Sequence, residues 1–256
     1  MVRAASPCAV KWQRGKEIKL AGSTRRISKT SIQLSVPGSQ FLLPEDRFAA
    51  GTMAGMRVPL WLKVGWSLWV LVWVPVYWHQ YGLQNFLYFC DLGNFFIGAA
   101  LWLESPLIFS GQACGLLLFQ TLYTIDLIGA LLTGAHIIGG TEYMFDPHIR
   151  LFVRLLSLFH VVTPPLLLWA IWRLGYDRRG WKYQTLTTWI VVPINYFWRP
   201  QYDVNWARGP FFREQHVVPG MVYLAAYLVI VPGLVYWPTH LILQWWARTG
   251  EDARPH

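Results

Sequence analysis

Charged residues are scarce in this sequence of 256 residues, since Asp, Glu, Lys and Arg together make up only 14% of it. Soluble domains carry roughly 25%, and 54% of this chain is hydrophobic, so the composition excludes an ordinary soluble domain and a disordered chain. Only three cysteines are present, Cys8, Cys90 and Cys114, and no CxxC pair, which excludes a disulfide framework. A GxSxG sequence, a phosphate-binding glycine loop and a haem-attachment sequence are also missing.

The first 56 residues lack any long apolar run, so they do not form a signal peptide. They hold nine Lys or Arg and three Asp or Glu, which places +6 of the net charge of +9 in this segment. We predict that residues 1–56 are a disordered basic leader or an upstream extension, with Met53 or Met56 as alternative starts. An ordered basic domain is the alternative, but the segment has few apolar residues to form a core.

Apolar stretches are abundant in residues 57–247. Their approximate limits are 61–79, 84–103, 106–134, 150–172, 181–199 and 217–245. Each is close to the roughly 20 residues that cross a hydrocarbon core of about 30 Å, and Trp and Tyr gather at the ends. Within a bilayer the backbone must satisfy its own hydrogen bonds, so each span should be a helix. The sequence therefore predicts an all-α bundle of six transmembrane helices, followed by a tail at 248–256.

The distribution of basic residues predicts the orientation of the bundle. The connection at 173–182 carries four basic residues: Arg173, Arg178, Arg179 and Lys182. Six spans put both termini on the side of this connection, and the positive-inside rule makes that side cytoplasmic. Arg199, Arg208 and Arg213 lie in the fifth connection and oppose this orientation. We predict a multi-pass protein of the bacterial inner membrane, and no nucleic-acid partner, because topology accounts for the charge.

Three polar residues in different spans are predicted to lie at a similar depth. At 1.5 Å per residue, Cys90 is about 9 Å, Asp126 about 12 Å and His160 about 14 Å below the outer ends of their helices. A carboxylate near the bilayer centre costs at least about 2.5–3.5 kcal/mol on insertion scales, so such residues need a reason. The pattern predicts an outward-facing polar site that includes Asp91 beside Cys90. Hydrogen bonding between helices alone is the alternative explanation.

Further residues are predicted to contact a substrate at this site. Arg154, Ser157 and His160 recur at i, i+3 and i+6 and therefore line one side of the fourth span. We add Asn195 in the fifth span, and Asn205 in the connection that follows it, which could cover the outer mouth. The third connection holds His, Asp and Glu side chains without a metal-binding spacing, so no metal or cofactor is predicted.

Several short motifs give the chain a family resemblance over about residues 59–245. They are Phe89-Cys90-Asp91, Phe159-His160, Asp203-Val204-Asn205-Trp206 with Gly209-Pro210, and Tyr236-Trp237-Pro238. With these motifs the chain resembles the YwaF-like six-span bacterial integral membrane proteins. That family is distantly similar to a eukaryotic six-span phospholipid acyltransferase that depends on a membrane cysteine. The resemblance implies an acyl group carried by Cys90, with His160 as its base.

The residues are compatible with that chemistry. A thiol nucleophile needs a nearby base, which His160 would supply, with Asp91 or Asp126 orienting its ring. Arg154 would hold a lipid phosphate near the interface, so membrane lipids are the predicted partners.

A non-enzymatic membrane protein is the alternative function. It would be a small transporter, or an accessory subunit that packs in a membrane complex or as a homo-oligomer. Discontinuous helices favour transport, and prolines that could break four spans are Pro75, Pro164, Pro165, Pro193, Pro232 and Pro238.

Overall fold

The computed structural model describes residues 58–198, 200–210 and 214–252. The predicted leader at 1–56 lies outside the described residues, as do Arg199, Arg213 and residues 253–256 of the predicted tail. The described residues are helical with no strand among them, which confirms the all-α prediction. The last helix continues to Asp252, five residues into the segment that we predicted to be a tail.

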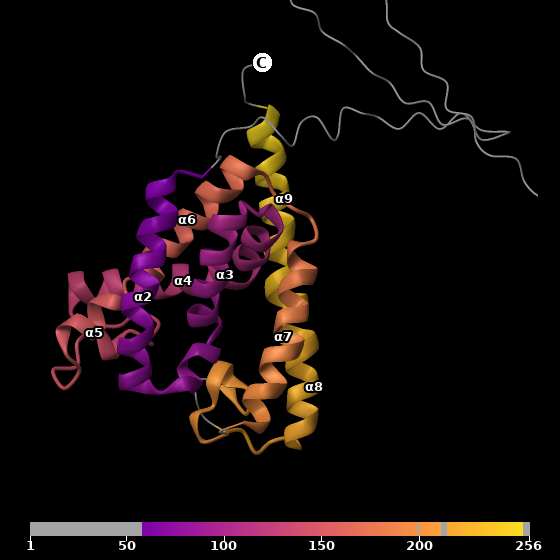
Figure 1. Cartoon of the computed structure of the whole chain (residues 1–256). Helices are drawn as coiled ribbons and strands as arrows, with labels where there is room; N and C mark the ends of the chain where they lie inside the picture. Colours follow the sequence, from indigo (N-terminus) through magenta and orange to yellow (C-terminus); the bar gives the residue numbers. More distant parts are fainter. Residues whose placement is uncertain (1–57, 199, 211–213, 253–256) are drawn as a thin grey trace, which may run out of the picture. The chain divides into compact units, whose positions relative to one another are not determined.

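The described helices form successive columns that alternate in direction along the chain (Figure 1). In chain order they are α2 (Leu60–Tyr81), α3 (Phe89–Leu103), α4 (Pro106–Thr133), α5 (Leu151–Leu156) with α6 (Phe159–Leu174), α7 (Gly180–Phe197), and α8 (Gly220–Val231) with α9 (Trp237–Asp252). Helix α4 is central and packs against α3, α6, α7 and α9. The connections at 104–105 and 175–179 mark what we call the basic end. The described residues of the connections at 82–88, 134–150 and 198–219 mark the opposite, open end.

Four helical segments are long and apolar enough to cross a membrane. They are Leu60–Tyr81, Pro106–Thr133, Leu151–Leu174 and Gly220–Thr249, in a search limited to the described residues. Helix α3 is apolar but has only 15 residues. Helix α7 has 18 residues, among them Lys182, Gln184 and Asn195, which lower its hydropathy. The structure therefore supports a membrane location with four candidate spans, and the count of six remains a prediction.

Large apolar side chains on the outside of the helices also suit a bilayer. Leu71 of α2, Leu132 of α4 and Val229 of α8 are 70%, 81% and 71% exposed. Soluble proteins rarely leave extensive apolar surface uncovered. Lipid chains would cover these side chains without cost to the fold.

Local sequence signals explain where α4 begins and ends. The Ser105 hydroxyl accepts a hydrogen bond from the Ile108 N–H at 3.4 Å, and Pro106 occupies the first turn, where its missing N–H costs nothing. At the other end Gly134 adopts a φ of 73° and donates its N–H to the Ala130 carbonyl at 2.9 Å. Glycine tolerates this left-handed conformation, so it ends the helix.

Two predicted spans are not single helices. The segment predicted at 84–103 begins as a 3₁₀ helix, η1 (Leu83–Leu87), and α3 starts only at Phe89. The segment predicted at 150–172 is interrupted between α5 and α6, where Ser157 and Leu158 form a tighter turn with hydrogen bonds to residues three positions back. Both interruptions lie toward the open end.

The prolines break fewer helices than expected. Helices α2, α6 and α7 continue through Pro75, Pro164 with Pro165, and Pro193. Only in the last column does the geometry change, to a π-helical turn, η6 (Pro232–Tyr236), in which the Trp237 N–H bonds to the Pro232 carbonyl. Pro238 has no N–H and cannot donate the next hydrogen bond of a regular α-helix, so the hydrogen bonds there follow the wider π-helical pattern. The expected set of four broken spans is therefore wrong.

Aromatic rings form a ladder along α2. Trp66, Trp69, Trp73, Tyr77 and Tyr81 recur every three or four residues, and successive ring centroids are 5.1–5.3 Å apart. This spacing puts all five on one helix face. The ladder leads from the basic half of the bundle to the open end, where Trp73 and Tyr77 are buried against Phe159 of α6.

Several buried polar side chains in the basic half of the bundle are hydrogen-bonded to one another or to the backbone. Among the described residues these pairs are Lys63 with Glu104 (2.8 Å), Ser110 with the Asp177 N–H (2.9 Å), Gln112 with Gln184 (3.5 Å), Thr188 with Tyr236 (2.8 Å) and His240 with Tyr176 (2.7 Å). A buried polar group without a partner is costly, so these hydrogen bonds stabilise the packing of the helices in this half.

Candidate functional site

Cys90 is the second residue of α3, at the open end of the bundle. It packs against the buried cluster that includes Trp73, Tyr77 and Phe159, and it is partly buried itself. Asn205, 116 residues from Phe89 in the chain, fixes the start of this helix. Its side-chain oxygen accepts from the Phe89 N–H at 2.9 Å, and its amide nitrogen donates to the Leu87 carbonyl at 2.7 Å. Asn205 thus positions Cys90, and both ends of its amide are engaged within the chain.

Asp91 follows Cys90 and is turned into the protein. It is 4% exposed, and one carboxylate oxygen accepts from the Asn85 side chain at 2.5 Å. Asp91 therefore has a polar partner in η1, next to the thiol.

His160 is the second residue of α6 and lies between two aromatic rings. Its ring stacks on Phe159 at 4.0 Å and on Tyr123 of α4 at 4.2 Å. Its Nδ1 lies 2.8 Å from the Ser157 carbonyl oxygen, which can only accept, so Nδ1 carries the proton. This tautomer leaves Nε2 with a free lone pair, the state that a general base requires.

Hydroxyl groups connect the helices around His160. Ser157 is hydrogen-bonded to Tyr77 of α2, and Tyr143 of the third connection is hydrogen-bonded to Tyr123 of α4 at 2.8 Å. Cys90 packs against the buried cluster that contains Tyr77 and Phe159, and the Phe159 ring stacks on His160. Cys90 and His160 therefore share one neighbourhood, although they make no hydrogen bond with each other in the described part of the chain.

Asp126 has a different environment from that expected. One of its oxygens accepts from the N–H groups of Ile138 and Gly139 at 2.7 and 2.9 Å. The other accepts from His136 at 3.0 Å and from Thr141. Asp126 thus holds the third connection against α4, and the His160 ring is oriented by the Ser157 carbonyl instead.

Arg154 and Asn195 are each partly engaged. Arg154 donates to the Met144 carbonyl at 2.8 Å, while its Nε is buried without a partner among the described residues. Asn195 donates weakly to the Leu87 carbonyl at 3.5 Å, and its side-chain oxygen has no partner in the described structure. Both residues lie toward the open end, with free hydrogen-bonding capacity.

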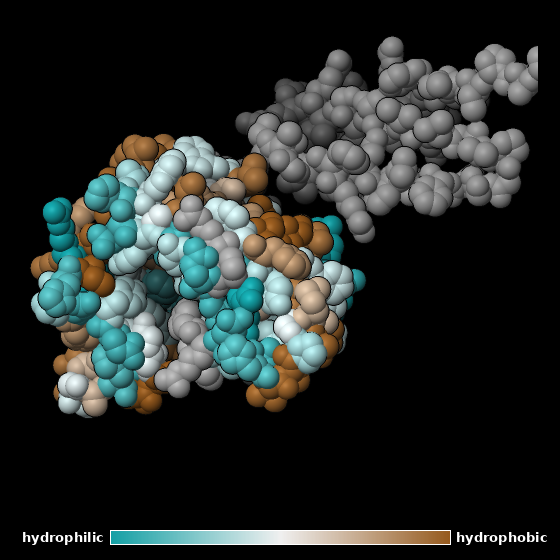
Figure 2. All heavy atoms as spheres, turned by 90° about the horizontal axis from the view of Figure 1, so that it is seen from below, coloured by the Kyte–Doolittle hydropathy of each residue, from teal (hydrophilic) through white to brown (hydrophobic). Residues whose placement is uncertain are grey.

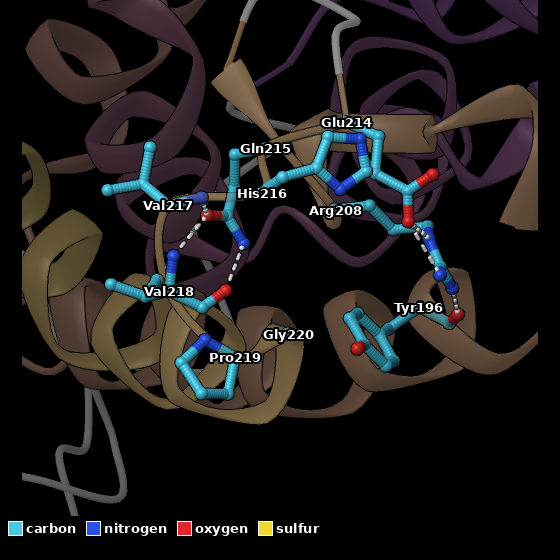
Figure 3. A pocket seen from close by; sticks show the side chains of 9 residues that line it. All are labelled: Tyr196, Arg208, Glu214, Gln215, His216, Val217, Val218, Pro219 and Gly220. Carbon is cyan, nitrogen blue, oxygen red and sulfur yellow. Dashed lines mark hydrogen bonds and ion pairs between the residues drawn. The ribbon is translucent and has the colours of Figure 1, made fainter.

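A recess opens in the face of the protein at this end. Figure 2 shows the face hollowed near its middle, with hydrophilic side chains around the hollow. A separate pocket of about 460 Å³ lies where α7 ends and α8 begins (Figure 3). There Arg208 packs over the Tyr196 ring at 4.9 Å and pairs with Glu214 at 2.8 Å, which lowers the pKa of Glu214. The Gln215 side chain bonds to the backbone of Val217 and Val218, so the polar groups of this pocket mainly hold its own loop.

Two residues near the site were not predicted from the sequence. Tyr77 was not singled out, although the repeat of aromatic residues along the first span was a signal for a buried helix face. Thr163 was also missed, because a threonine in a helix usually bonds to its own backbone. In the described structure the Thr163 hydroxyl has no partner.

In comparisons with known proteins, no family model, no curated protein and no solved structure matches the chain. The described residues contain no group of three or more His, Cys, Asp or Glu side chains that could hold a metal ion. The chemistry of the site is therefore inferred from its own residues.

Proposed function

We propose that this protein is a six-span integral membrane enzyme that transfers acyl groups between membrane lipids through Cys90. The observation that carries the proposal is the His160 tautomer. Its Nδ1–H is engaged by the Ser157 carbonyl, and its Nε2 is left as a base in the neighbourhood of a partly buried thiol. The resemblance to a cysteine-dependent acyltransferase family points to the same two residues.

The proposed reaction has two half-reactions. His160 Nε2 accepts the thiol proton while Cys90 Sγ attacks the ester carbonyl of a phospholipid. The carbon–sulfur bond forms, the ester carbon–oxygen bond breaks, and His160 returns the proton to the departing lysolipid oxygen. The hydroxyl of a second lipid then attacks the thioester, gives its proton to His160 and releases the thiol, so no oxidant or cofactor is consumed.

The remaining residues have supporting roles in this proposal. Asn205 and the start of α3 hold Cys90 in place, and Ser157 fixes the His160 ring. Arg154 and Asn195 have unused polar atoms toward the same end and would contact the lipid head group. A rearrangement would still be needed to bring the Cys90 thiol and the His160 imidazole into hydrogen-bond range, and catalytic hydrogen bonds are often long in sites without substrate.

The proposal is tested by searching for the thioester. Purified full-length protein is incubated with phospholipids labelled in the acyl chain, and Cys90 is then examined by mass spectrometry. We expect an acyl adduct on Cys90 that hydroxylamine removes. Wild-type protein that forms no adduct with any of several phospholipid classes would contradict the proposed function.

The six-span topology predicts opposite labelling of the two ends. In a chain whose three native cysteines are replaced, Val217→Cys lies at the open end, where Val217 is 92% exposed, and Arg178→Cys lies at the basic end. A membrane-impermeant maleimide should label Val217→Cys in intact spheroplasts and Arg178→Cys only after permeabilisation. Arg208 lies in the fifth connection, whose basic residues oppose this orientation. Its ion pair with Glu214 offsets its charge and so weakens that opposition. The reverse labelling pattern would overturn the orientation.

A further inference from the structure

Two arginines converge on one neutral side chain at the basic end of the bundle. Arg178 lies in the connection at 175–179, and Arg248 lies near the end of α9. The Nη2 atom of Arg178 is 2.5 Å, and that of Arg248 is 3.0 Å, from the same side-chain atom of Gln244. Arginine only donates hydrogen bonds, so this atom is the amide oxygen. The two Nη2 atoms are therefore at most 5.5 Å apart, the sum of these two distances.

The contacts of the connection with α9 explain why the two arginines meet. Gln244 and Arg248 are four residues apart on α9, so they share one helix face. His240 lies one turn earlier on that face, and its Nδ1 is 2.7 Å from the Tyr176 hydroxyl. This hydrogen bond holds the connection against α9 two residues before Arg178, which then reaches Gln244 in the next turn of the helix.

None of the described carboxylates neutralises this pair of charges. Asp177 precedes Arg178 in the chain, but its two oxygens accept from Arg179 Nε and Nη2 at 3.1 and 2.8 Å. Within the described structure neither Arg178 nor Arg248 forms an ion pair. Two like charges at this separation repel each other, and each guanidinium has five N–H donors, of which the Gln244 oxygen uses only a part. The pair therefore retains positive charge and donors for an anion.

The position of the arginines corresponds to the surface of a bilayer. Arg178 is four residues beyond the candidate span Leu151–Leu174, and Arg248 is one residue before the end of the span Gly220–Thr249. The last part of α9 lies at this end of the bundle (Figure 1). Both arginines are exposed, and so is Trp245, at 67%. Tryptophan is enriched at the head-group level of membranes, so the groups nearest to this pair are lipid head groups.

We propose that Arg178 and Arg248 bind the phosphate of an anionic phospholipid head group. Guanidinium groups match phosphate oxygens with paired, charge-assisted hydrogen bonds, and one oxygen about 2.8 Å from each donor spans up to about 5.6 Å. Two positive charges favour a head group of net negative charge, such as phosphatidylglycerol. Phosphatidylcholine is disfavoured, because its own ammonium group offsets its phosphate. This end is the predicted cytoplasmic side, and the site, at the opposite end from Cys90, does not depend on acyl transfer.

Lipid binding to the purified full-length protein tests this site. Native mass spectrometry in detergent measures the dissociation constants of phosphatidylglycerol and of phosphatidylcholine with the same acyl chains. We expect phosphatidylglycerol to bind more tightly. Arg178→Gln or Arg248→Gln should weaken its binding roughly fivefold, and the two substitutions together roughly thirtyfold, as expected for basic residues at an anionic surface. Binding of phosphatidylcholine should stay unchanged.

Two controls separate a specific lipid site from a general effect of charge. Arg173→Gln makes the same change of charge at another exposed arginine of this end and should weaken phosphatidylglycerol binding less than roughly twofold. An effect as large as that of Arg178→Gln would overturn the proposed site. Inorganic phosphate in excess should leave phosphatidylglycerol bound, and complete displacement by it would contradict a lipid ligand.

A substitution at Gln244 tests the site while both arginines stay in place. Gln244→Glu puts a carboxylate between the two guanidinium groups, which then have a counter-ion within the protein. It should weaken phosphatidylglycerol binding at least roughly tenfold and raise the melting temperature of the lipid-free protein by roughly 2–4 °C, because charge-assisted hydrogen bonds are stronger. A Gln244→Glu protein that binds phosphatidylglycerol like the wild type, or a wild type that binds both lipids equally, would overturn the proposal, whatever the outcome of the acyl-adduct assay.

Discussion

Replacing Cys90 by serine should abolish acyl transfer and remove the hydroxylamine-sensitive adduct. A hydroxyl is a far weaker nucleophile than a thiol unless a strong base activates it, and a neutral imidazole serves a thiol better. His160→Ala should lower the transfer rate by roughly 10²–10⁴-fold, the usual contribution of a general base. Both effects are measured as initial rates of labelled acyl transfer in mixed micelles.

The chain provides a matched control for the cysteine. Cys114 is buried on α4 in the basic half, where its sulfur lies 3.3 Å from the Tyr176 hydroxyl. Cys114→Ser should retain the adduct and the rate, because this residue is far from the open end. A Cys90→Ser variant that transfers acyl groups at the wild-type rate would exclude the thioester route.

Asp126→Ala should destabilise the protein by about 2–4 kcal/mol, because it removes the acceptor for four donors at once. The N–H groups of Ile138 and Gly139 would be left without a partner, and the third connection would lose its anchor on α4. Asp126→Asn keeps one oxygen for these two N–H groups and should recover about half of the loss. Thermal melting in detergent, followed by near-UV circular dichroism, measures both variants.

Asp146 is the control for this carboxylate. It lies in the same connection, but within the described structure its side chain makes a single exposed hydrogen bond, which it accepts from the His148 N–H at 2.8 Å. Asp146→Ala should therefore change stability by less than about 1 kcal/mol. Equal melting temperatures for Asp126→Ala and Asp146→Ala would refute the anchoring role. Loss of acyl transfer in a well-folded Asp126→Asn protein would instead indicate that Asp126 takes part in the proposed reaction.

The parts of the fold that sequence predicts well are those set by local chemistry. Apolar stretches identified every helical column, and Ser105, Pro106 and Gly134 mark the ends of α4 as the capping rules predict. Prolines were misleading because neighbouring helices compensate for them. Pro164 cannot donate to the His160 carbonyl, and the Thr124 hydroxyl of α4 approaches that oxygen at 3.5 Å instead.

The site was harder to predict because its partners are distant in sequence. Counting residues placed Cys90, Asp126 and His160 at a similar depth, but it could not reveal that the connection after α4 folds back onto Asp126. Nor could it show that Asn205 caps a helix more than a hundred residues earlier. The depth of a residue in the bundle follows from the rise of its helix. Which residue it faces, and which hydrogen bonds it makes, depend on how the connections fold back onto the helices, and a single sequence carries little information on that.

The aromatic ladder of α2 gives the protein an intrinsic spectroscopic signal. Indole rings stacked 5.3 Å apart, as Trp69 and Trp73 are, couple their intense far-ultraviolet transitions and give exciton circular dichroism. The same ladder continues to Tyr77, which contacts Ser157 next to the His160 ring. A shift of α2 against α6 would therefore alter the exciton signal. Movement of these helices at the open end can thus be followed in the unlabelled protein, without introducing a dye.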